Sequence, residues 1–286
     1  MLLRGSSFLL QARKAQQAVP AFVAYNMEMV QGIVASAEQT ERPVILIAGS
    51  SAFRFAGLRT LATMALDIAR DSNAHVAVQL DHSRSIEEIE TCLALGYSSV
   101  MFDGTHLSYE ENISTTKSVV SAAHEVGAWV EAELVGIAGD EDVSTDAVAS
   151  SMTDPQQALE FARETGIDAL SVAVGNVHGF TSQSPVIDFE RLNEIASLVR
   201  IPLVLHGASG LGDQVLSQCV AAGVSKVNVN SELRRAYLEA LGTVQADNTA
   251  DGGLVSCLLL AREAVTASAT RIINLLEAPL LKGTGR

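Results

Sequence analysis

The sequence predicts an α/β protein in which eight parallel strands alternate with helices and close into one barrel. A short apolar run, a polar or glycine-containing turn and an amphipathic helical pattern recur in that order along most of the chain. A glycine or proline precedes most of the apolar runs, and polar side chains follow them. A doubly wound open sheet would rarely need eight such regular units, so we expect a TIM (β/α)8 barrel.

The expected strands are apolar runs of ordinary strand length. In chain order they are Val19–Tyr25, Pro43–Ala48, Val76–Asp81, Ser99–Asp103, Ala128–Glu133, Ala169–Gly175, Pro202–Gly207 and Lys226–Asn230. Helical patterns lie between them at residues 29–40, 85–95, 111–126, 154–165, 188–199 and 213–222. No linker or change of composition interrupts the series. Residues 1–286 therefore form one predicted domain, with strands over about 19–230 and a helical C-terminal segment over 231–280.

Composition and charge restrict the class of protein. The 286 residues are 48% hydrophobic and 18% charged, which suits a large buried core. A formal net charge of -14 argues against a nucleic-acid partner but leaves room for a small phosphorylated ligand. The cysteines Cys92, Cys219 and Cys257 show no CxxC spacing and are expected as core residues. The longest apolar stretch, residues 252–261, is shorter than a membrane span, so we expect a cytoplasmic protein without a membrane partner.

The most informative stretch is His75–His82, HVAVQLDH, a buried strand that ends directly in Asp81 and His82. An ionised aspartate is costly to bury without partners, whereas a carboxylate beside an imidazole can serve a metal or a proton transfer. The alternative is that Asp81 or Ser83 caps the helix that follows. This stretch alone does not decide between the two.

Polar residues recur at the ends of the other expected strands. In a barrel of this kind, catalytic groups lie at the C-terminal ends of the strands. The residues at these ends are Asp81, His82, Asp103, Glu133, His178, His206, Asn228 and Asn230. Three imidazoles that converge over one mouth, with an open position, match a catalytic zinc site. We therefore expect a metal at His82, His178 and His206, although no local zinc motif is present.

Charged residues also alternate along two of the expected strands. Trp129, Glu131 and Glu133 share one side of the fifth strand, which faces either the barrel interior or a helix. An interior pair of carboxylates needs a proton, a cation or several donors. We favour Glu133 near the metal and Glu131 in a structural role. An inward Lys226 could form a Schiff base, but neutralisation by interior carboxylates is the favoured interpretation.

Two glycine- and serine-containing loops are candidates for phosphate binding. They are HGASGLGD after the seventh expected strand and NVNSE after the eighth. Glycines let backbone N–H groups approach an anion, and Ser209 or Ser231 can add hydroxyl donors. Ser231 is also expected to be the N-cap of the next helix. These two loops are the recurrent phosphate site of TIM barrels.

Several of these strings together resemble the motifs of a known enzyme family. QLDH, SVMFDGTHLSYEENI, VEAEL, GNVHG, LVLHGASG and KVNVNSEL are similar to those of the class II (zinc-dependent) ketose-bisphosphate aldolases, in the tagatose- and fructose-bisphosphate aldolase branch. The match runs in order from about Pro20 to Leu238. The resemblance implies a cytoplasmic, homodimeric or homotetrameric lyase of carbohydrate metabolism, in glycolysis or a related route. Its reaction would be reversible retro-aldol cleavage of a ketose phosphate to dihydroxyacetone phosphate and an aldehyde.

The resemblance also implies a role for each matching residue. Zn2+ would be held by His82, His178 and His206. Asp81 would transfer a proton at the C4 hydroxyl, and Glu141, in a mobile loop, would transfer one at the enediolate carbon. A second divalent cation or a monovalent cation would lie at Asp103 and Glu133. The dihydroxyacetone-phosphate site would comprise Gly179, Gly207, Ser209, Asn228 and Ser231. The alternatives are a Schiff-base aldolase that uses Lys226 and a non-catalytic aldolase-like partner subunit.

The chain departs from the family pattern in two places near the expected site. The family usually has AFN where this chain has Ala21-Phe22-Val23, so a substrate-facing amide is replaced by valine. The family usually has ELGRxGG where this chain has residues 133–139, ELVGIAG, which alters the loop that carries Glu141. The stretch after Gly242 is also shorter than in the family pattern. These departures bear on the substrate more than on the metal chemistry.

Overall fold

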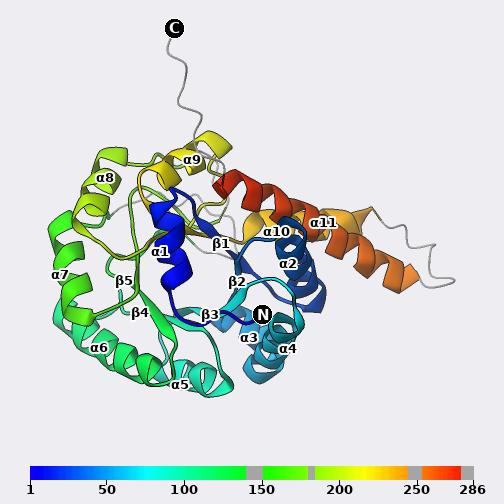
Figure 1. The fold of residues 1–286 in the computed structure, drawn as a ribbon, viewed down its shortest axis with the longest axis horizontal. Coiled ribbons are helices and arrows are strands. Elements are labelled where there is room, and N and C mark those ends of the chain that lie inside the picture. Colours follow the sequence, from blue (N-terminus) through cyan, green and yellow to red (C-terminus); the bar gives the residue numbers. More distant parts are fainter. Residues whose placement is uncertain (140–150, 180–183, 244–252, 278–286) are drawn as a thin grey trace, which may run out of the picture.

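The computed structural model describes residues 1–139, 151–179, 184–243 and 253–277. Within these ranges, eight parallel strands form a closed barrel in which each strand pairs with the next and β8 pairs with β1 (Figure 1). The predicted TIM barrel is confirmed. Because all the strands run in one direction, their C-terminal ends meet at one rim, which we call the C-terminal rim.

The strands match the eight predicted apolar runs in order. They are β1 Val19–Val23, β2 Val44–Gly49, β3 Val76–Ser83, β4 Ser99–Asp103, β5 Trp129–Glu133, β6 Ala169–Ser171, β7 Leu203–Leu205 and β8 Val224–Val229. The sixth strand is shorter than predicted because the side-chain oxygen of Asn176 accepts from the backbone N–H of Val174 at 2.8 Å. The chain therefore turns there rather than continuing to Gly175.

The described helices lie around the barrel and at its N-terminal end. They are α1 Ser7–Lys14, α2 Met27–Thr40, α3 Ser50–Ala56, α4 Leu58–Asp71, α5 Ile86–Leu95, α6 Tyr109–Glu125, α7 Pro155–Thr165, α8 Phe189–Leu198, α9 Asp213–Ala221, α10 Ser231–Gly242 and α11 Gly253–Glu277. The sequence patterns did not predict α3 and α4. The alternative that Asp81 or Ser83 caps α5 is wrong, because the side chain of Ser85 accepts from the backbone N–H of Glu88 at 3.2 Å. Asp81 is therefore not needed as a cap.

The barrel interior changes from apolar to polar along the strands. A buried apolar cluster fills the interior near the strand starts and, on β1 and β2, continues up to Val23 and Ile47; it is formed by Leu9, Val19, Ala21, Val23, Ile45, Ile47, Ala77, Trp129, Ala169 and Val204. On β3, β5 and the end of β7, the next inward position toward the C-terminal rim is polar: Gln79 follows Ala77, Glu131 follows Trp129 and His206 follows Val204. Glu131 and Glu133 are both buried on the side of β5 that carries Trp129, so the alternative that this side faces a helix is wrong.

Helix α1 closes the N-terminal end of the barrel (Figure 1). Leu9 is fully buried in the interior cluster, and the Phe8 ring packs edge-on against Trp129, with ring centroids 6.3 Å apart. Arg13 at the end of the helix donates to the carbonyls of Ala196 and Val199, both at 2.8 Å. The helix is therefore fixed by packing at one face and by hydrogen bonds at its end.

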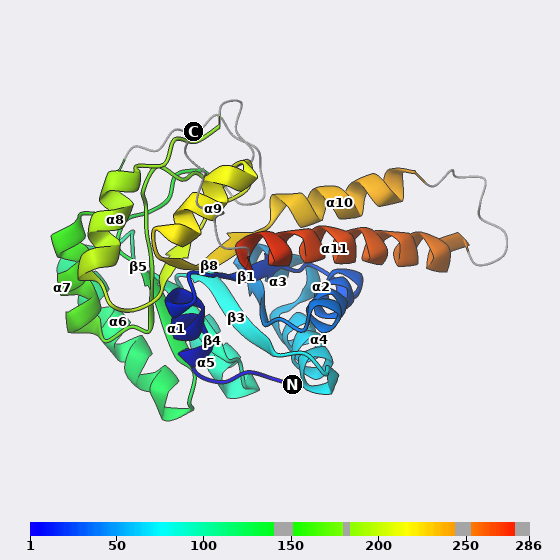
Figure 2. The ribbon, with the colours of Figure 1, turned by 45° about the horizontal axis from the view of Figure 1, so that its top comes forward.

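Helices α10 and α11 lie side by side and extend away from the barrel (Figure 2), and we call them the C-terminal arm. By length and composition alone, the 25-residue α11 could cross a membrane, since an 18-residue window within it has a mean hydropathy of 1.2. The sequence-based expectation considered only residues 252–261, which are too short for a span. The second half of α11, however, supplies Val265, Ala269 and Ile273 to the barrel's hydrophobic core. Apolar composition in that half is explained by packing against the barrel.

Replacement of Leu9 by alanine should destabilise the barrel. Deleting a fully buried leucine side chain costs roughly 2–5 kcal/mol, because apolar contacts are lost and a cavity remains. The neighbouring Leu10 is 39% exposed, so Leu10→Ala should change the stability by less than about 0.5 kcal/mol. Urea unfolding followed by circular dichroism measures both variants. Equal effects would mean that α1 does not close the barrel in solution.

Candidate active site

The strands deliver the predicted site residues to the C-terminal rim. Asp81 and His82 end β3, where the register with β4 shifts between Leu80 and Ser83. His82 has φ 44°, a left-handed conformation that is uncommon for a residue other than glycine. This conformation lets two consecutive residues, Asp81 and His82, both line the same pocket.

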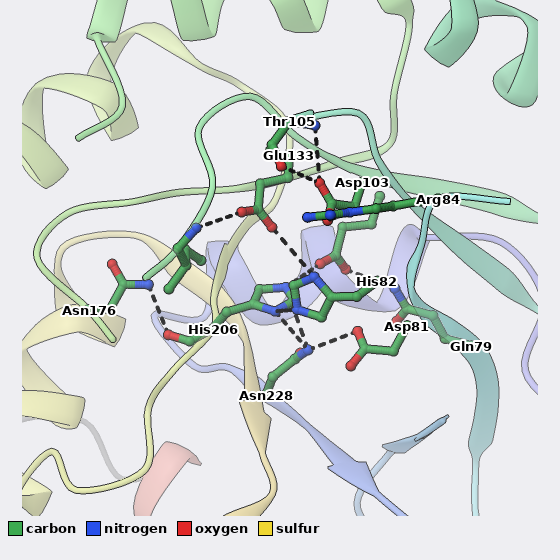
Figure 3. A network of polar contacts seen from close by, with 12 residues as sticks. Gln79, Asp81, His82, Arg84, Asp103, Thr105, Glu133, Asn176, His206 and Asn228 are labelled. Atoms are coloured by element: carbon green, nitrogen blue, oxygen red, sulfur yellow. Dashed lines mark hydrogen bonds and ion pairs between the residues drawn. The ribbon is translucent and has the colours of Figure 1, made fainter. Parts of the chain in front are cut away.

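Three histidines that are distant in the sequence come together, and Figure 3 shows two of them, His82 and His206, side by side. One nitrogen from each of His82, His178 and His206 lies within 4.8 Å of the others. Their ring centroids are 4.6 to 5.9 Å apart, and Nδ1 of His206 is 2.8 Å from Nε2 of His82. A cluster of three imidazole nitrogens is the donor set of a catalytic zinc site. The described residues therefore fit the metal that the sequence suggested.

His206 is the deepest of the three ligand candidates. It is fully buried, its Nε2 lies 2.7 Å from Oε1 of Glu131, and its backbone carbonyl accepts from the Asn176 amide at 2.9 Å. Burial and the adjacent His82 lower the pKa of His206 to about 3. Its imidazole is therefore neutral over the physiological range, which is the state that can bind a metal.

Glu131 and Lys226 form a buried ion pair below the histidines. Nζ of Lys226 donates to Oε2 of Glu131 and to Oδ1 of Asn228, both at 2.7 Å. Burial alone would raise the pKa of Glu131, but Lys226 and His206 outweigh it and lower that pKa. Lys226 is fully buried and already engaged by two acceptors, which disfavours the Schiff-base alternative.

Asp81 lies between the pocket and an amide. It is buried yet lines the pocket, and its Oδ1 accepts from Nδ2 of Asn228 at 3.2 Å. The carboxylate is thus held at the pocket wall beside the histidine cluster. This placement suits a group that exchanges a proton with a bound substrate.

The carboxylate of Glu133 is only partly satisfied by the protein. Its Oε1 accepts from the backbone N–H of Ile137 at 2.9 Å, while its buried Oε2 has no hydrogen-bond donor among the described residues and lies 3.7 Å from Nδ1 of His82. Burial raises the pKa of Glu133 to about 7, and the nearby carboxylates of Asp103 and Glu131 add to the rise. A buried carboxylate oxygen without a donor beside the histidines is what a bound cation would satisfy.

Asp103, the other residue expected at a second cation, has protein partners at both oxygens. Its Oδ2 accepts from Nε of Arg84 at 2.7 Å, and its Oδ1 accepts from the backbone N–H and the hydroxyl of Thr105. Burial would raise the pKa of Asp103, but these hydrogen bonds and the Arg84 charge outweigh it and lower that pKa. Arg84 was not among the site residues predicted from sequence.

A pocket of about 380 Å³ opens at the C-terminal rim beside these groups. It is lined by Val23, Tyr25, Gly49, Ser50, Ser51, Arg54, Asp81, His82, Arg84, Asp103, Thr105, Glu133, Gly136, Ile137, Gly139 and His178. The sequence reasoning missed the contribution of Ser50, Ser51 and Arg54 from α3. These residues were missed because α3 was not predicted. The segment after any strand of this barrel begins at the C-terminal rim, so a helix directly after β2 lies beside the pocket.

The chain also matches a known protein family over nearly its whole length. The family model described as class-II fructose-bisphosphate aldolase matches residues 4–279. The chain belongs to this family. It is therefore an aldolase, a carbon–carbon lyase, and the sequence-based predictions of family and enzyme class are confirmed.

Solved structures agree with this assignment. The YdjI aldolase of Escherichia coli K12 is 32% identical, with 96% of this chain and 97% of that chain covered and a TM-score of 0.86. A putative fructose-1,6-biphosphate aldolase from Coccidioides immitis is 30% identical, with 96% of each chain covered and a TM-score of 0.86. The fructose-bisphosphate aldolase of Campylobacter jejuni is 19% identical, with 96% of this chain and 95% of that chain covered. Its TM-score of 0.82 shows the same fold.

The two loops predicted to bind phosphate lie next to the aldolase site. Gly207 has φ 59°, and a Cβ there would meet the Val177 carbonyl carbon at 2.5 Å, so the close approach requires glycine. The hydroxyl of Ser209 donates to Glu232 at 2.7 Å. The predicted N-cap role of Ser231 is wrong, because Asn230 precedes the first residue of α10 and no side chain caps it. The Ser231 hydroxyl is instead buried without a hydrogen-bond partner in the part of the chain described.

The altered segment 134–139 still holds the aldolase site together. The backbone N–H of His178 donates to the Ala138 carbonyl at 2.8 Å, and Gly139 pairs with His178. A Cβ at Gly139 would meet the His178 carbonyl oxygen at 2.6 Å. Glu141, which was predicted to transfer a proton, lies outside the described residues. Gly179 is the last described residue before the second gap.

The pKa of Glu133 predicts a pH dependence of stability for the metal-free aldolase. With a pKa of about 7 in the folded state, against 4.5 for an ordinary glutamate carboxyl, Glu133 binds a proton more readily in the folded chain than in the unfolded chain between these pH values. Stability should therefore fall as the pH rises through this window, by roughly 3 kcal/mol from this group. Glu133→Gln should remove that slope in urea titrations with EDTA at about pH 5 and about pH 8. An unchanged slope would show that Glu133 ionises normally.

Proposed function

We propose that this aldolase is zinc-dependent and cleaves a ketose phosphate to dihydroxyacetone phosphate and an aldehyde. The observation that carries the proposal is the convergence of His82, His178 and His206 at the rim where Asp81 lines the pocket. Nitrogen ligands from three histidines leave a position open for substrate, as in catalytic zinc sites. When bound, zinc would supply Lewis-acid polarisation of the substrate oxygens.

The buried polar groups around the cluster support a cation there. Oε2 of Glu133 is buried without a donor, and it lies 3.7 Å from His82. We extend the proposal to a second divalent or a monovalent cation near Glu133 and Asp103. Asp103 would join such a site only by exchanging its present partner Arg84 for the cation, because both of its oxygens accept hydrogen bonds.

Asp81 is proposed to accept the proton of the substrate's C4 hydroxyl during cleavage. As that proton leaves, the C4 oxygen forms the aldehyde carbonyl and the bond between C3 and C4 breaks. The electron pair of that bond stays with the three-carbon half, which then takes up a proton to give dihydroxyacetone phosphate. Asn228 holds the Asp81 carboxylate toward the pocket with a 3.2 Å hydrogen bond. From the family resemblance, Glu141 is proposed to supply the proton that the three-carbon half takes up.

The phosphate is proposed to bind at the loops after β7 and β8. Gly207 allows the close backbone approach, and the buried Ser231 hydroxyl has an unused donor at the start of α10. The first turn of a helix also presents backbone N–H groups to an anion. Gly179, Ser209 and Asn228 complete the set that the family resemblance assigns to this phosphate-bearing half of the substrate.

The rest of the pocket supports a substrate that differs from the common bisphosphates. Val23 lines the pocket at the place where the family usually has an amide, so one substrate oxygen loses a hydrogen bond there. A hydrogen bond of ordinary strength contributes about 0.5–1.5 kcal/mol. We therefore propose slow turnover of fructose- or tagatose-1,6-bisphosphate and a preference for a substrate that is less polar at this contact.

The C-terminal arm supports the proposal of a homodimer or homotetramer. Large apolar side chains are exposed along it, among them Leu238, Leu254, Val255 and Leu259. Side chains of this kind gather where subunits meet.

Removal of the metal or of one ligand should abolish cleavage. We expect the wild-type chain to bind zinc and to release an aldehyde from at least one member of a panel of ketose phosphates. EDTA should stop the reaction, and His178→Ala should lose zinc and reduce kcat/KM by about 10³-fold. Elemental analysis and a coupled aldehyde assay measure both effects. His124→Ala, on the surface of α6, is the matched control and should keep metal and activity. Full activity in EDTA would overturn the zinc proposal.

Asp81→Asn should lose turnover while it keeps its metal. The amide preserves the shape of the side chain but cannot accept the C4 proton, and a general base typically contributes about 10²–10⁴-fold to the rate. Steady-state kinetics give kcat, and elemental analysis gives the zinc content. A variant with nearly normal kcat would exclude Asp81 from proton transfer.

A further inference from the structure

Two buried charges below the histidine cluster have no part in the proposed chemistry. Glu131 and Lys226 are both fully buried and pair at 2.7 Å. A buried ion pair is a weak source of stability, because the cost of removing two charges from water offsets most of their attraction. Apolar residues of similar size would fill the barrel as well. The pair therefore needs an explanation beyond packing.

The hydrogen bonds of Glu131 determine which nitrogen of His206 carries the proton. Oε2 of Glu131 accepts from Lys226 at 2.7 Å and from the Gln79 amide at 2.9 Å, and Oε1 lies 2.7 Å from Nε2 of His206. An ionised carboxylate can only accept, so Nε2 of His206 has to be the N–H donor. A neutral imidazole has one such proton, which leaves Nδ1 as a lone pair.

That lone pair points into the histidine cluster. Nδ1 of His206 is 2.8 Å from Nε2 of His82, and the Asn228 amide approaches it at 3.2 Å as a donor (Figure 3). Metal-binding histidines usually donate their second ring N–H to a carboxylate or carbonyl, which fixes the tautomer and the ring orientation. Glu131 occupies that place relative to His206.

We propose that Glu131 is a positioning residue that holds His206 in the tautomer able to present Nδ1 to the metal, and that Lys226 holds Glu131 in place. The inference rests on the proposed metal site. It gives the ion pair a role that neither Schiff-base chemistry nor packing supplies.

Lys226 connects the same network to the proton-transfer group. Its second hydrogen bond goes to Oδ1 of Asn228 at 2.7 Å. Because the ammonium fixes the oxygen end of that amide, Nδ2 has to face Asp81 and His206, each at 3.2 Å. A single buried cation therefore orients both a predicted metal ligand and the predicted proton acceptor.

Glu131→Gln tests the proposal with a nearly isosteric change. Lys226 and Gln79 both donate to Oε2 of Glu131. The new amide should therefore place its oxygen at that position and its NH2 group against Nε2 of His206. Two donors would then face each other, and the His206 proton should move to Nδ1. We expect ¹⁵N-histidine NMR of the metal-free protein to show the Nε2–H tautomer for wild-type His206 and the Nδ1–H tautomer for the variant. Zinc titration against a chelator should show about 10–100-fold weaker binding by the variant.

Val204→Ala is the matched control. Val204 is a fully buried inward residue on β7, two positions before His206, and it makes no side-chain hydrogen bond. This variant should lose stability through a cavity and yet keep the Nε2–H tautomer. If Glu131→Gln does not fold because Lys226 is left without its counter-charge, Glu131→Leu/Lys226→Met removes both charges together with the acceptor for Nε2 of His206, and the same change of tautomer is expected.

The outcomes are distinct. A changed tautomer together with weakened zinc binding in the glutamine variant supports the proposal, and an unchanged His206 tautomer overturns it. A changed tautomer with unchanged zinc affinity also overturns it, because positioning would then have no consequence for the metal. The NMR measurement uses metal-free protein and needs no substrate, so failure of the zinc aldolase proposal would be seen separately in the activity and metal assays.

Discussion

The constraint on which the site depends is that charges inside a closed barrel have to be satisfied by one another. Glu131, Lys226, Gln79 and His206 meet this constraint through hydrogen bonds of 2.7 to 2.9 Å, with the charged groups out of contact with water. Glu131 accepts from donors on β3 and β8 and from His206, directly after β7. The position of His206 is therefore set by the whole barrel rather than by its own loop, which is how a metal ligand is held to within a small tolerance.

The change from apolar to polar interior explains why the barrel can contain this network at all. The lower layer, around Leu9, Trp129 and Val204, is apolar and closed by α1, so it contributes burial without requiring partners. The polar layer follows one pleat later on the same strands. Stability and chemistry thus occupy successive layers of one interior, and they share the strands that carry them.

Much of the fold was predictable from the sequence, because the apolar runs and the Gly or Pro before most strands are local signals. The eight strands follow from these signals, whereas α3 and α4 were missed because Gly57 divides their helical pattern. The convergence of the histidines followed from the rule that strand ends share a rim. The role of Glu131 could not be predicted, since alternation places Trp129, Glu131 and Glu133 on one side of β5 but does not say which side faces inward. Partner choices such as Arg84 with Asp103 depend on side chains from different strands.

The two sides of the pocket differ in how their residues are held. The histidines, Asp81 and their buried partners lie on β3, β5, β6, β7 and β8 or the segments that follow them, and hydrogen bonds hold His206 and Asp81 in place. The side near β1 and β2 carries Val23, Ser51 and Arg54. These residues take no part in the hydrogen-bond network around Glu131. A substitution there leaves the buried charges undisturbed. Val23 continues the apolar lower layer up to the rim on β1, so this departure from the family pattern lies on the side of the pocket that takes no part in the buried network.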